Sequence, residues 1–239
     1  FKSNIFKIIS SEFVDVIALW KLLTICELLL FITLFEKETC FFCLVGAGAL
    51  VYLSEKAGIP KGVINLLVAN NPIPIGKELC DNFSVRKISF TGSTEVGKIL
   101  IKDSANSVKR ISMELGGNAP LIVFNDADIE VAVKETLASK YRNSGQTCVC
   151  ANRIFVQEGI YEKYSEALAK KVNSFNVGDG FEDASDIGPL IDESGLKKVE
   201  RHLEDAISKG AKVLTGGKQP SLGGLYFEPT VLTEVQSNM

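Results

Sequence analysis

The sequence has one histidine, His202, among 239 residues. A single imidazole excludes a metal centre built from several histidines, and it excludes catalytic schemes that need a Ser-His-Asp relay plus a second histidine. The chain also lacks an excess of positive charge, since 26 basic and 29 acidic side chains give a formal net charge of −3. Nucleic-acid binding is therefore not expected, because phosphate recognition requires a basic surplus or a basic stripe.

Cysteine is also scarce, with six residues in the whole chain. This density is far below that of secreted domains stapled by disulfides, so a reducing compartment is expected. The chain is 46% hydrophobic and 23% charged, which excludes wholesale disorder. Its length allows one large domain or two small ones, each with its own core.

A clear membrane span is missing, although the first 45 residues are apolar. The run Leu22–Phe35 has 14 residues and includes Glu27, whereas a span requires about 20 apolar residues. A carboxylate at the centre of the bilayer costs about 3 kcal/mol. We therefore expect residues 1–45 to be buried or foreign to the mature protein rather than membrane-spanning. No secretory signal or Arg-rich transit helix is evident.

From about Leu50 the pattern becomes that of an alternating α/β protein, with helical spacing between short β-rich runs. A turn is expected over residues 70–76, loops over 143–150 and 176–189, and an N-cap at Asp126. The run 119–124 is expected to form a fully buried strand. Helices are predicted over 50–56, 94–106, 128–141, 161–172 and 193–209, and strands over 62–69, 85–90, 109–115, 119–124, 153–156, 213–215 and 226–235.

The first candidate site is the turn between the strand 85–90 and the helix that begins near Thr94. The first turn of a helix presents unpaired N–H groups and the positive end of the helix dipole, which together suit a phosphate. Gly92 allows close approach of a ligand, and the hydroxyls of Ser93 and Thr94 can donate to an anion. The alternative is an ordinary helix cap, with Glu95 well placed in the first turn.

Two further candidates are Cys148 and Glu114. Cys148 lies in a polar loop where a thiol is accessible, and thiolates are strong nucleophiles near neutral pH. Glu114 ends a strand, where apolar walls would raise its pKa and make it a general base. The alternatives are an inert small side chain and a solvated surface carboxylate. Cys148 and Cys150 alone cannot complete a tetrahedral metal site, so no metal is expected.

Three segments in this order and spacing resemble the aldehyde dehydrogenase superfamily. They are FTGSTEVGK (90–98), SMELGGNAP (112–120) and RNSGQTC (142–148), with Glu114 and Cys148 34 positions apart. Within the superfamily, the chain is most similar to the succinate-semialdehyde dehydrogenase family. This similarity is carried by RNSGQTCVCANR, ANSVKRISMELGGNAP and VGDGFEDASDIGPLI. It extends over about residues 50–239.

The resemblance implies an α/β fold with the carboxyl part of a Rossmann-type dinucleotide domain over 46–115 and a truncated α/β catalytic domain over 116–239. It implies oxidation of succinate semialdehyde to succinate with NAD or NADP. Cys148 would attack the aldehyde, and Glu114 would activate the water that hydrolyses the thioester. The residues implied to contact the dinucleotide are Gly92, Ser93, Thr94, Glu95, Val96, Gly97 and Leu115.

The resemblance also gives roles to Arg142 and Cys150. Arg142 matches the arginine that holds the distal carboxylate of the substrate, and a guanidinium suits a bidentate contact. The alternative is a cation that stabilises a helix C-terminus. Cys150 matches a second cysteine that pairs with the nucleophile in some members, so it is a possible redox partner. Two cysteines at i and i+2 are only marginally close enough for a disulfide.

Several family segments have no counterpart in this sequence. These include a Trp-Asn-Phe-Pro stretch with the oxyanion-holding Asn, and a Lys-Pro strand that holds the adenosine ribose and decides between NAD and NADP. Loss of one oxyanion donor typically costs a factor of about 10² to 10³ in turnover. We therefore expect this chain to be poorly active alone. The family implies a homo-oligomer in the mitochondrion or cytoplasm. Alternatives are a dehydrogenase for another semialdehyde, or a non-catalytic fragment that binds a partner or a membrane.

Overall fold

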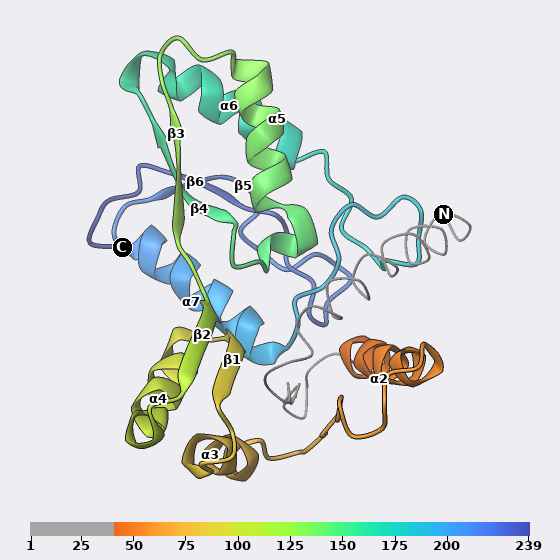
Figure 1. The fold of residues 1–239 in the computed structure, drawn as a ribbon. Helices are drawn as coiled ribbons and strands as arrows, with labels where there is room; N and C mark the ends of the chain where they lie inside the picture. The colour runs from red at the N-terminus through yellow and green to blue at the C-terminus, as the bar shows by residue number, and fades with distance from the viewer. Residues whose placement is uncertain (1–40) are drawn as a thin grey trace. The chain divides into compact units, whose positions relative to one another are not determined.

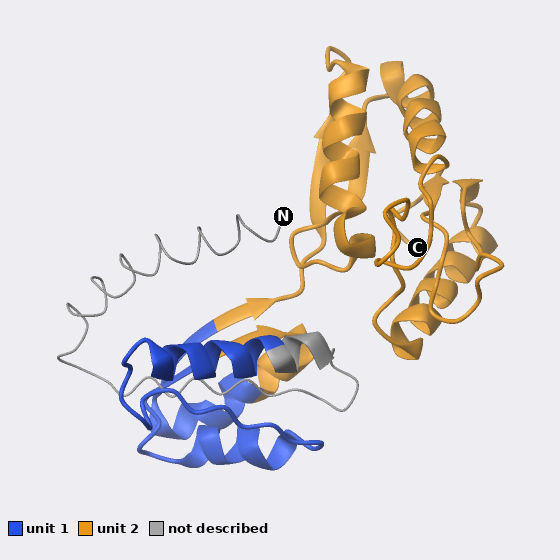
Figure 2. Ribbon diagram, turned by 90° about the vertical axis from the view of Figure 1, so that its right-hand side faces the viewer, with its two compact units in different colours: residues 1–88, 100–112 blue, residues 89–99, 113–239 orange. Residues whose placement is uncertain are grey.

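The computed structural model describes residues 41–239, which divide into two compact units (Figures 1 and 2). The first unit includes residues 41–88 and 100–112, and the second includes residues 89–99 and 113–239. The apolar run 22–35 lies outside the described residues. Among residues 41–239, no helix combines the length and the apolar character needed to cross a membrane.

The first unit contains two helices that precede the first strand. Helix α2 spans Phe41–Lys56, and α3 spans Ile73–Asp81. The turn expected over 70–76 is wrong from Ile73 onward, because Pro74 lies in the first turn of α3, where a missing N–H costs nothing. The strand expected over 62–69 is also absent. No strand of the described chain pairs with that segment, so its β-rich composition alone does not produce one.

A strand, a turn and a helix follow in the order that the sequence predicts. Strand β1 (Lys87–Gly92) and strand β2 (Arg110–Leu115) form a two-stranded sheet. Helix α4 (Thr94–Ser104) and the short helix η1 (Ala105–Ser107) connect them. The start of β2 is fixed by Lys109, whose ammonium donates to the carbonyls of Asn82 at 2.6 Å and Val85 at 2.8 Å. Lys109 thereby anchors the strand that carries Glu114.

The second unit is built on two parallel strands, β3 (Ala119–Val123) and β4 (Ala151–Val156). Helix α5 (Ile129–Lys140), the short helix η3 (Glu158–Ile160) and helix α6 (Tyr161–Val172) accompany them. The N-cap of α5 is Asp128 rather than Asp126, because the carboxylate of Asp128 accepts from the N–H of Val131 at 3.1 Å. The bounds of α6 agree with the prediction.

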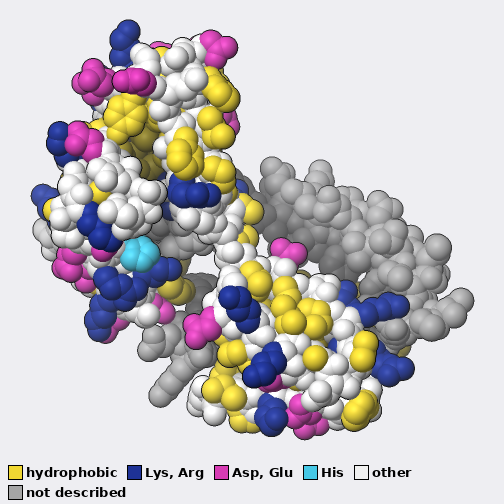
Figure 3. All heavy atoms as spheres, turned by 90° about the vertical axis from the view of Figure 1, so that its left-hand side faces the viewer, with side chains coloured by type: hydrophobic (Ala, Val, Ile, Leu, Met, Phe, Trp, Pro, Cys, Tyr) yellow, Lys and Arg dark blue, Asp and Glu magenta, His cyan; other side chains and the backbone are white. Residues whose placement is uncertain are grey.

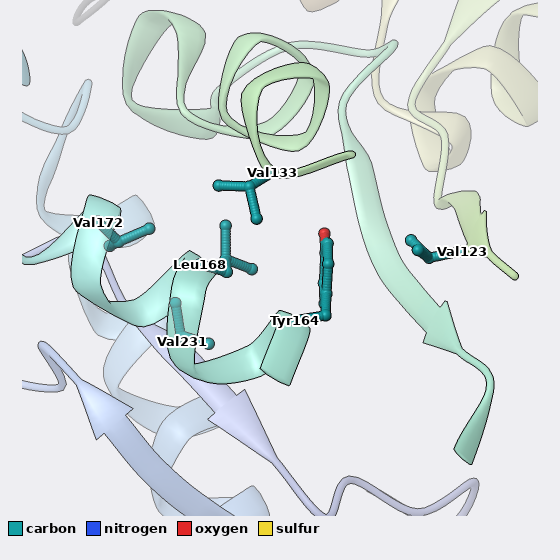
Figure 4. Packing of buried hydrophobic residues seen from close by; sticks show 6 residues of the cluster. All are labelled: Val123, Val133, Tyr164, Leu168, Val172 and Val231. Atoms are coloured by element: carbon teal, nitrogen blue, oxygen red, sulfur yellow. The ribbon is translucent and has the colours of Figure 1, made fainter. Parts of the chain in front are cut away.

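The core of this unit lies between α5, α6 and the sheet. Figure 4 shows the side chains of Val133, Leu168 and Tyr164 converging between the two helices. The Tyr164 hydroxyl, in a side chain only 1% exposed, shares a 2.6 Å hydrogen bond with Thr136. This bond satisfies two buried polar groups that would otherwise destabilise the core. Ile129 and Leu137 pack against the same cluster, as the four-residue apolar spacing of α5 predicts.

The other face of the β3–β4 sheet is exposed. Register neighbours Ile122 and Phe155 are 59% and 52% exposed, and Phe124 beyond the strand is 56% exposed. The expectation that 119–124 forms a fully buried strand is therefore wrong. Side chains alternate along a strand, and α5 and α6 pack against the side that carries Val123. Apolar side chains also gather at the surface in the space-filling view (Figure 3).

The remaining elements of the second unit are α7 (Glu193–Ser208) and the antiparallel strands β5 (Lys212–Thr215) and β6 (Val231–Thr233). Strand β6 is shorter than the predicted strand over 226–235. Pro229 removes a ladder donor before it, and Glu234 after it has φ +57°, outside the β region. The predicted apolar stripe of α7 is half-buried, except for the exposed Ile207.

Tyr141, directly after α5, links this helix to the last part of the chain. Its hydroxyl donates to the carbonyl of Thr230 at 3.1 Å, and its ring lies 5.6 Å from that of Phe175. Burial, with a smaller contribution from Tyr164, raises the pKa of Tyr141 above its ordinary value of 10.0. The folded protein therefore keeps this phenol neutral at a pH where the unfolded chain ionises it.

We expect Tyr141→Phe to reduce the alkaline sensitivity of folding. Because the folded pKa is raised, the contribution of Tyr141 is complete below about pH 10 and is lost as the pH rises further, by up to about 1.4 kcal/mol per pH unit. The variant should lose about 1 kcal/mol at neutral pH with its hydrogen bond. Urea unfolding at neutral and alkaline pH measures both effects. An unchanged pH dependence would contradict the assignment.

Candidate active site

The loop that carries Cys148 begins with an unusual backbone turn. The short helix η2 spans Arg142–Gly145 directly after α5, and three consecutive residues in it have left-handed φ values. These values are +53° for Asn143, +55° for Ser144 and +73° for Gly145. For residues other than glycine, such a conformation costs about 1–3 kcal/mol each, and it persists only where surrounding contacts enforce it.

Side chains from the loop supply those contacts. Ser144 donates to the carbonyl of Gly188 at 2.9 Å. Gln146 accepts from the N–H of Ile191 at 2.8 Å and donates to the carbonyl of Pro189 at 3.4 Å. The loop is therefore tied to residues 188–191, more than 40 positions later in the sequence. These bonds fix the backbone two residues before Cys148.

The two cysteines of this loop have different environments. Cys148 is exposed, in agreement with the expectation of an accessible thiol, whereas Cys150 is 1% exposed. The sulfur of Cys150 lies 2.5 Å from the Thr147 hydroxyl and donates to the carbonyl of Gly145 at 3.3 Å. A buried, hydrogen-bonded thiol is a structural group in this conformation. The redox pairing of Cys150 with Cys148 stays a prediction.

The turn that follows Glu114 lies directly against the backbone of Cys148. A Cβ atom built on Gly117 would be 2.8 Å from the carbonyl oxygen of Cys148. Such a distance leaves no room for a side chain at position 117. The structure therefore brings the segments that carry the two predicted catalytic groups together, although they are 34 positions apart in the sequence.

Glu114 itself is exposed at the end of β2. The expectation that apolar walls enclose this carboxylate does not hold for the described residues. Its connection to the Cys148 loop is through the backbone, because Gly117, which lies against Cys148, follows it by three residues. An exposed carboxylate retains access to water, which is the substrate that a general base must activate.

Arg142 is exposed, and within the described part of the chain it forms no ion pair. It follows the last residue of α5, Lys140, by two positions. That position fits a cation near a helix C-terminus, and it also leaves the guanidinium free to bind an anion. The exposed position after α5 is compatible with both roles of Arg142.

The turn before α4, the candidate dinucleotide contact, forms the ordinary helix cap that was the alternative interpretation. The hydroxyl of Ser93 accepts from the N–H of Val96 at 3.2 Å. Ser93, Thr94, Glu95 and Val96 are all exposed at the start of α4. The cap satisfies one N–H group and leaves other donors of the first turn available, so capping and phosphate binding are compatible.

Close packing joins this turn to the strand that bears Glu114. Gly97 is buried, and a Cβ atom on it would lie 2.7 Å from the Cδ2 atom of Leu115. At Gly92, a Cβ atom would collide with the ring of Phe90. Helix α4 therefore approaches β2 at Leu115, the residue next to Glu114.

A cavity of about 350 Å³ is lined in part by the loop that leads to Cys148. Ser144 and Gly145 line it together with Val199, His202 and Leu203 of α7. Cys148, Glu114 and Arg142 are not among its lining residues. The cavity is therefore separate from the candidate catalytic groups. Among the described residues, no cluster of three or more potential metal ligands occurs.

The described structure thus has an exposed thiol at Cys148, an exposed carboxylate at Glu114 three residues before the turn that meets the Cys148 backbone, and a glycine-containing turn at a helix N-terminus. The profile of the aldehyde dehydrogenase family matches residues 43–239, and the chain belongs to this family. The match begins within the segment 1–45 that the sequence alone left unmatched.

Among the curated proteins similar to this chain are enzymes whose names specify aldehydes with an acidic group. The chain is 53% identical over 193 residues to a probable succinate-semialdehyde dehydrogenase [NADP(+)] of Sinorhizobium fredii, covering 81% of this chain and 39% of the relative. It is 54% identical to a 3-sulfolactaldehyde dehydrogenase of Pseudomonas putida, covering 82% and 40%. It is 53% identical to a glutarate-semialdehyde dehydrogenase of Pseudomonas aeruginosa, covering 80% and 39%.

Solved structures agree with the fold. A succinate-semialdehyde dehydrogenase from Burkholderia pseudomallei aligns with TM-score 0.78 and 52% identity over 80% of this chain and 39% of that chain. A betaine aldehyde dehydrogenase from Staphylococcus aureus in complex with NAD⁺ aligns with TM-score 0.80 and 35% identity over 87% and 42%. The chain thus spans about two-fifths of the length of the relatives it matches, with a partial α/β fold of this family.

Proposed function

We propose that this chain carries the nucleophile and general base of an NAD(P)-dependent semialdehyde dehydrogenase whose substrate is succinate semialdehyde. The observation that supports this most is the contact of Gly117 with the backbone of Cys148. This contact links the turn after Glu114 to the exposed thiol. Complete activity is proposed for the longer polypeptide that the relatives exemplify, because the chain corresponds to 39% of the Sinorhizobium fredii enzyme.

In the proposed reaction, the thiolate of Cys148 adds to the carbonyl carbon and forms a thiohemiacetal. A bound nicotinamide dinucleotide supplies the two-electron oxidant that accepts the hydride. The resulting thioester on Cys148 is hydrolysed by a water molecule. Glu114 removes a proton from that water and thereby assists its attack on the thioester carbon, and the acid and free thiol are released. The exposed N-terminal turn of α4 suits the pyrophosphate of the dinucleotide.

The proposed substrate class is a short aldehyde with an anionic group at its other end. The enzymes named above act, by their names, on aldehydes that carry a distal carboxylate or a sulfonate. Arg142 is exposed and six positions before Cys148, and its guanidinium can form two parallel hydrogen bonds with either anion. We assign it to hold the distal acid, with succinate semialdehyde as the first choice and other semialdehydes as the alternative.

We expect Arg142→Ala to lower kcat/KM for succinate semialdehyde by about 100-fold, because a hydrogen bond to a charged group contributes about 1.5–3 kcal/mol. Turnover of butanal, which lacks the acid, should change little. Arg142→Lys should retain part of the preference. The assay uses a chimera in which residues 43–239 replace the matching segment of the Sinorhizobium fredii relative. Equal losses for both aldehydes would contradict the role of Arg142.

The same chimera tests the function as a whole. We expect it to reduce NAD⁺ or NADP⁺ in the presence of succinate semialdehyde and to accumulate an acyl group on Cys148 when hydrolysis is slowed. Glutarate semialdehyde and butanal serve as comparison substrates. A folded chimera that reduces neither nucleotide with any of these aldehydes would overturn the proposal.

A non-catalytic, partner-binding fragment is the second candidate. The exposed apolar face formed by Ile122, Phe124 and Phe155 favours it. Alkylation of Cys148 by iodoacetamide distinguishes the two candidates. A Cys148 thiol that is alkylated at a rate that changes when NAD⁺ is added supports the enzyme. A thiol that is alkylated slowly, at a rate unaffected by NAD⁺, supports the non-catalytic fragment.

A further inference from the structure

Side chains at the start of β4 bind the turn that follows Glu114. The amide nitrogen of Asn152 donates to the carbonyl of Gly117 at 3.4 Å. The guanidinium of the next residue, Arg153, donates through Nε to the carbonyl of Asn118 at 3.1 Å. Two successive carbonyls of the turn are therefore held by two successive residues of β4. Gly117 is also the residue that lies against Cys148.

Lys140, the last residue of α5, orients Asn152. Its ammonium donates to Oδ1 of Asn152 at 2.7 Å. This bond determines which end of the amide faces the turn, because only the nitrogen remains to donate to Gly117. In the described residues, Lys140 forms no ion pair with a carboxylate. Its side chain donates its hydrogen bond to the amide of Asn152.

The surroundings of Lys140 restrict its movement. A Cβ atom on Gly145 would lie 3.2 Å from the ammonium of Lys140 and 3.1 Å from its carbonyl oxygen. The left-handed turn thus packs on this lysine. Lys140 is half-buried, and burial lowers its pKa from the ordinary value of 10.5. The hydrogen bond to Asn152 therefore supplies this half-buried cation with a polar partner.

We propose that Asn152, oriented by Lys140, is a positioning residue that holds the Gly116-Gly117 turn against Cys148 and thereby sets the distance between the Glu114 carboxylate and the thiol. This inference rests on the proposed function, since it concerns the same two groups. Neither residue contacts the reacting atoms. Lys140 and Asn152 act through the backbone of Gly117, and their loss would leave both catalytic side chains in place but less well aligned.

A consequence of this arrangement is an electrostatic coupling between Glu114 and Cys148. Alkylation requires the thiolate of Cys148, and a negative charge at Glu114 repels a thiolate more strongly the closer the two groups lie. Replacing Glu114 with glutamine removes that charge and should speed the alkylation of Cys148 at a fixed pH. If Asn152 sets the distance between the two groups, its removal should shrink this rate change.

A double-mutant cycle tests the coupling in the 239-residue chain itself. The alkylation rate of Cys148 by iodoacetamide is measured at one fixed pH, with the modified peptide quantified by mass spectrometry. We expect Glu114→Gln to raise this rate about threefold. In the Asn152→Ala background, the same change should raise it by about 1.5-fold or less. Equal rate changes in both backgrounds, or no change in either, would overturn the proposal.

Variants of the two positioning residues separate alignment from general stability. Asn152→Asp keeps an acceptor for Lys140 but loses the donor to Gly117, so it should weaken the coupling as alanine does. Lys140→Met should weaken it, and Lys140→Arg should restore it in part. Lys134→Met, at an exposed position of the same helix, is the matched control and should leave it unchanged. If Lys134→Met weakens the coupling as much as Lys140→Met, the proposal fails.

Thermal unfolding of each variant shows which chains are folded, and the cycle is read from those. Asn152→Asp and Lys140→Met provide the readout if Asn152→Ala does not fold. The chimera distinguishes this inference from the function on which it rests. If the chimera turns over but Glu114→Gln has the same effect on Cys148 alkylation with and without Asn152, only the positioning role is overturned. If the coupling is found but the chimera does not reduce a nucleotide, the proposed enzymatic function is overturned and the contact between the two segments stands.

Discussion

Replacing Cys148 with alanine is expected to abolish aldehyde oxidation, lowering kcat of the chimera by about 10⁴-fold or more. In the proposed reaction the sulfur of Cys148 bonds to the aldehyde carbon, so both the oxidation and the hydrolysis depend on it. Cys80 and Cys150 cannot substitute, because each is only 1% exposed. The first turnover, measured as a burst of reduced nucleotide, should vanish together with the steady-state rate.

Two comparison variants show that the loss belongs to the nucleophile. Cys80→Ala removes a buried thiol of the first unit and should leave the burst intact. Glu114→Gln should retain the burst but slow the steady state, because it spares thioester formation and impairs hydrolysis. A persistent burst in Cys148→Ala would assign the nucleophile elsewhere.

Gly117→Ala adds a single methyl group, but we expect it to reduce both stability and activity strongly. The added methyl would lie 2.8 Å from the carbonyl oxygen of Cys148, a backbone atom that cannot rotate away. The turn after Glu114 must then shift away from the Cys148 loop. We expect a loss of about 1–3 kcal/mol in the free energy of unfolding. Turnover should fall about 100-fold, as it does when a catalytic group is displaced by about 1 Å.

Gly116→Ala is the matched control for this prediction. No atom lies within 4 Å of a Cβ built at Gly116, so the same methyl group meets open space one residue earlier. Urea unfolding and the alkylation rate of Cys148 should be nearly unchanged in this variant. Similar losses for the two alanine variants would show that the contact with Cys148 is not what makes Gly117 necessary.

Local apolar spacing predicted the helices of the second unit well. The bounds of α6 agree with the prediction, and Ile129, Val133 and Leu137 of α5 face one core. A helix satisfies its hydrogen bonds within one segment, so its pattern is visible in that segment. Strands require neighbours, and the run 62–69 has none in the described chain. Its composition therefore could not establish that it pairs.

The same distinction between local and long-range interactions separates the site residues that the sequence predicted from those that it did not. Cys148 and Glu114 were predicted because their residue types and flanking motifs indicate reactivity. Gln146, Lys140 and Asn152 were not, because their contribution is a side-chain bond to a distant backbone or amide group. Such a long-range bond cannot be predicted from the sequence alone. The doubled glycine after Glu114 was visible, but its close approach to Cys148 was not.

The left-handed turn at residues 143–145 also limits how this region of the chain can vary. Asparagine, aspartate and glycine tolerate positive φ, whereas valine, isoleucine and threonine strongly resist it. Positions 143 and 144 should therefore accept only a few residue types, even where no ligand contacts them. An inserted or deleted residue between Arg142 and Cys148 would rotate the thiol out of register, so the length of this segment is as constrained as its chemistry.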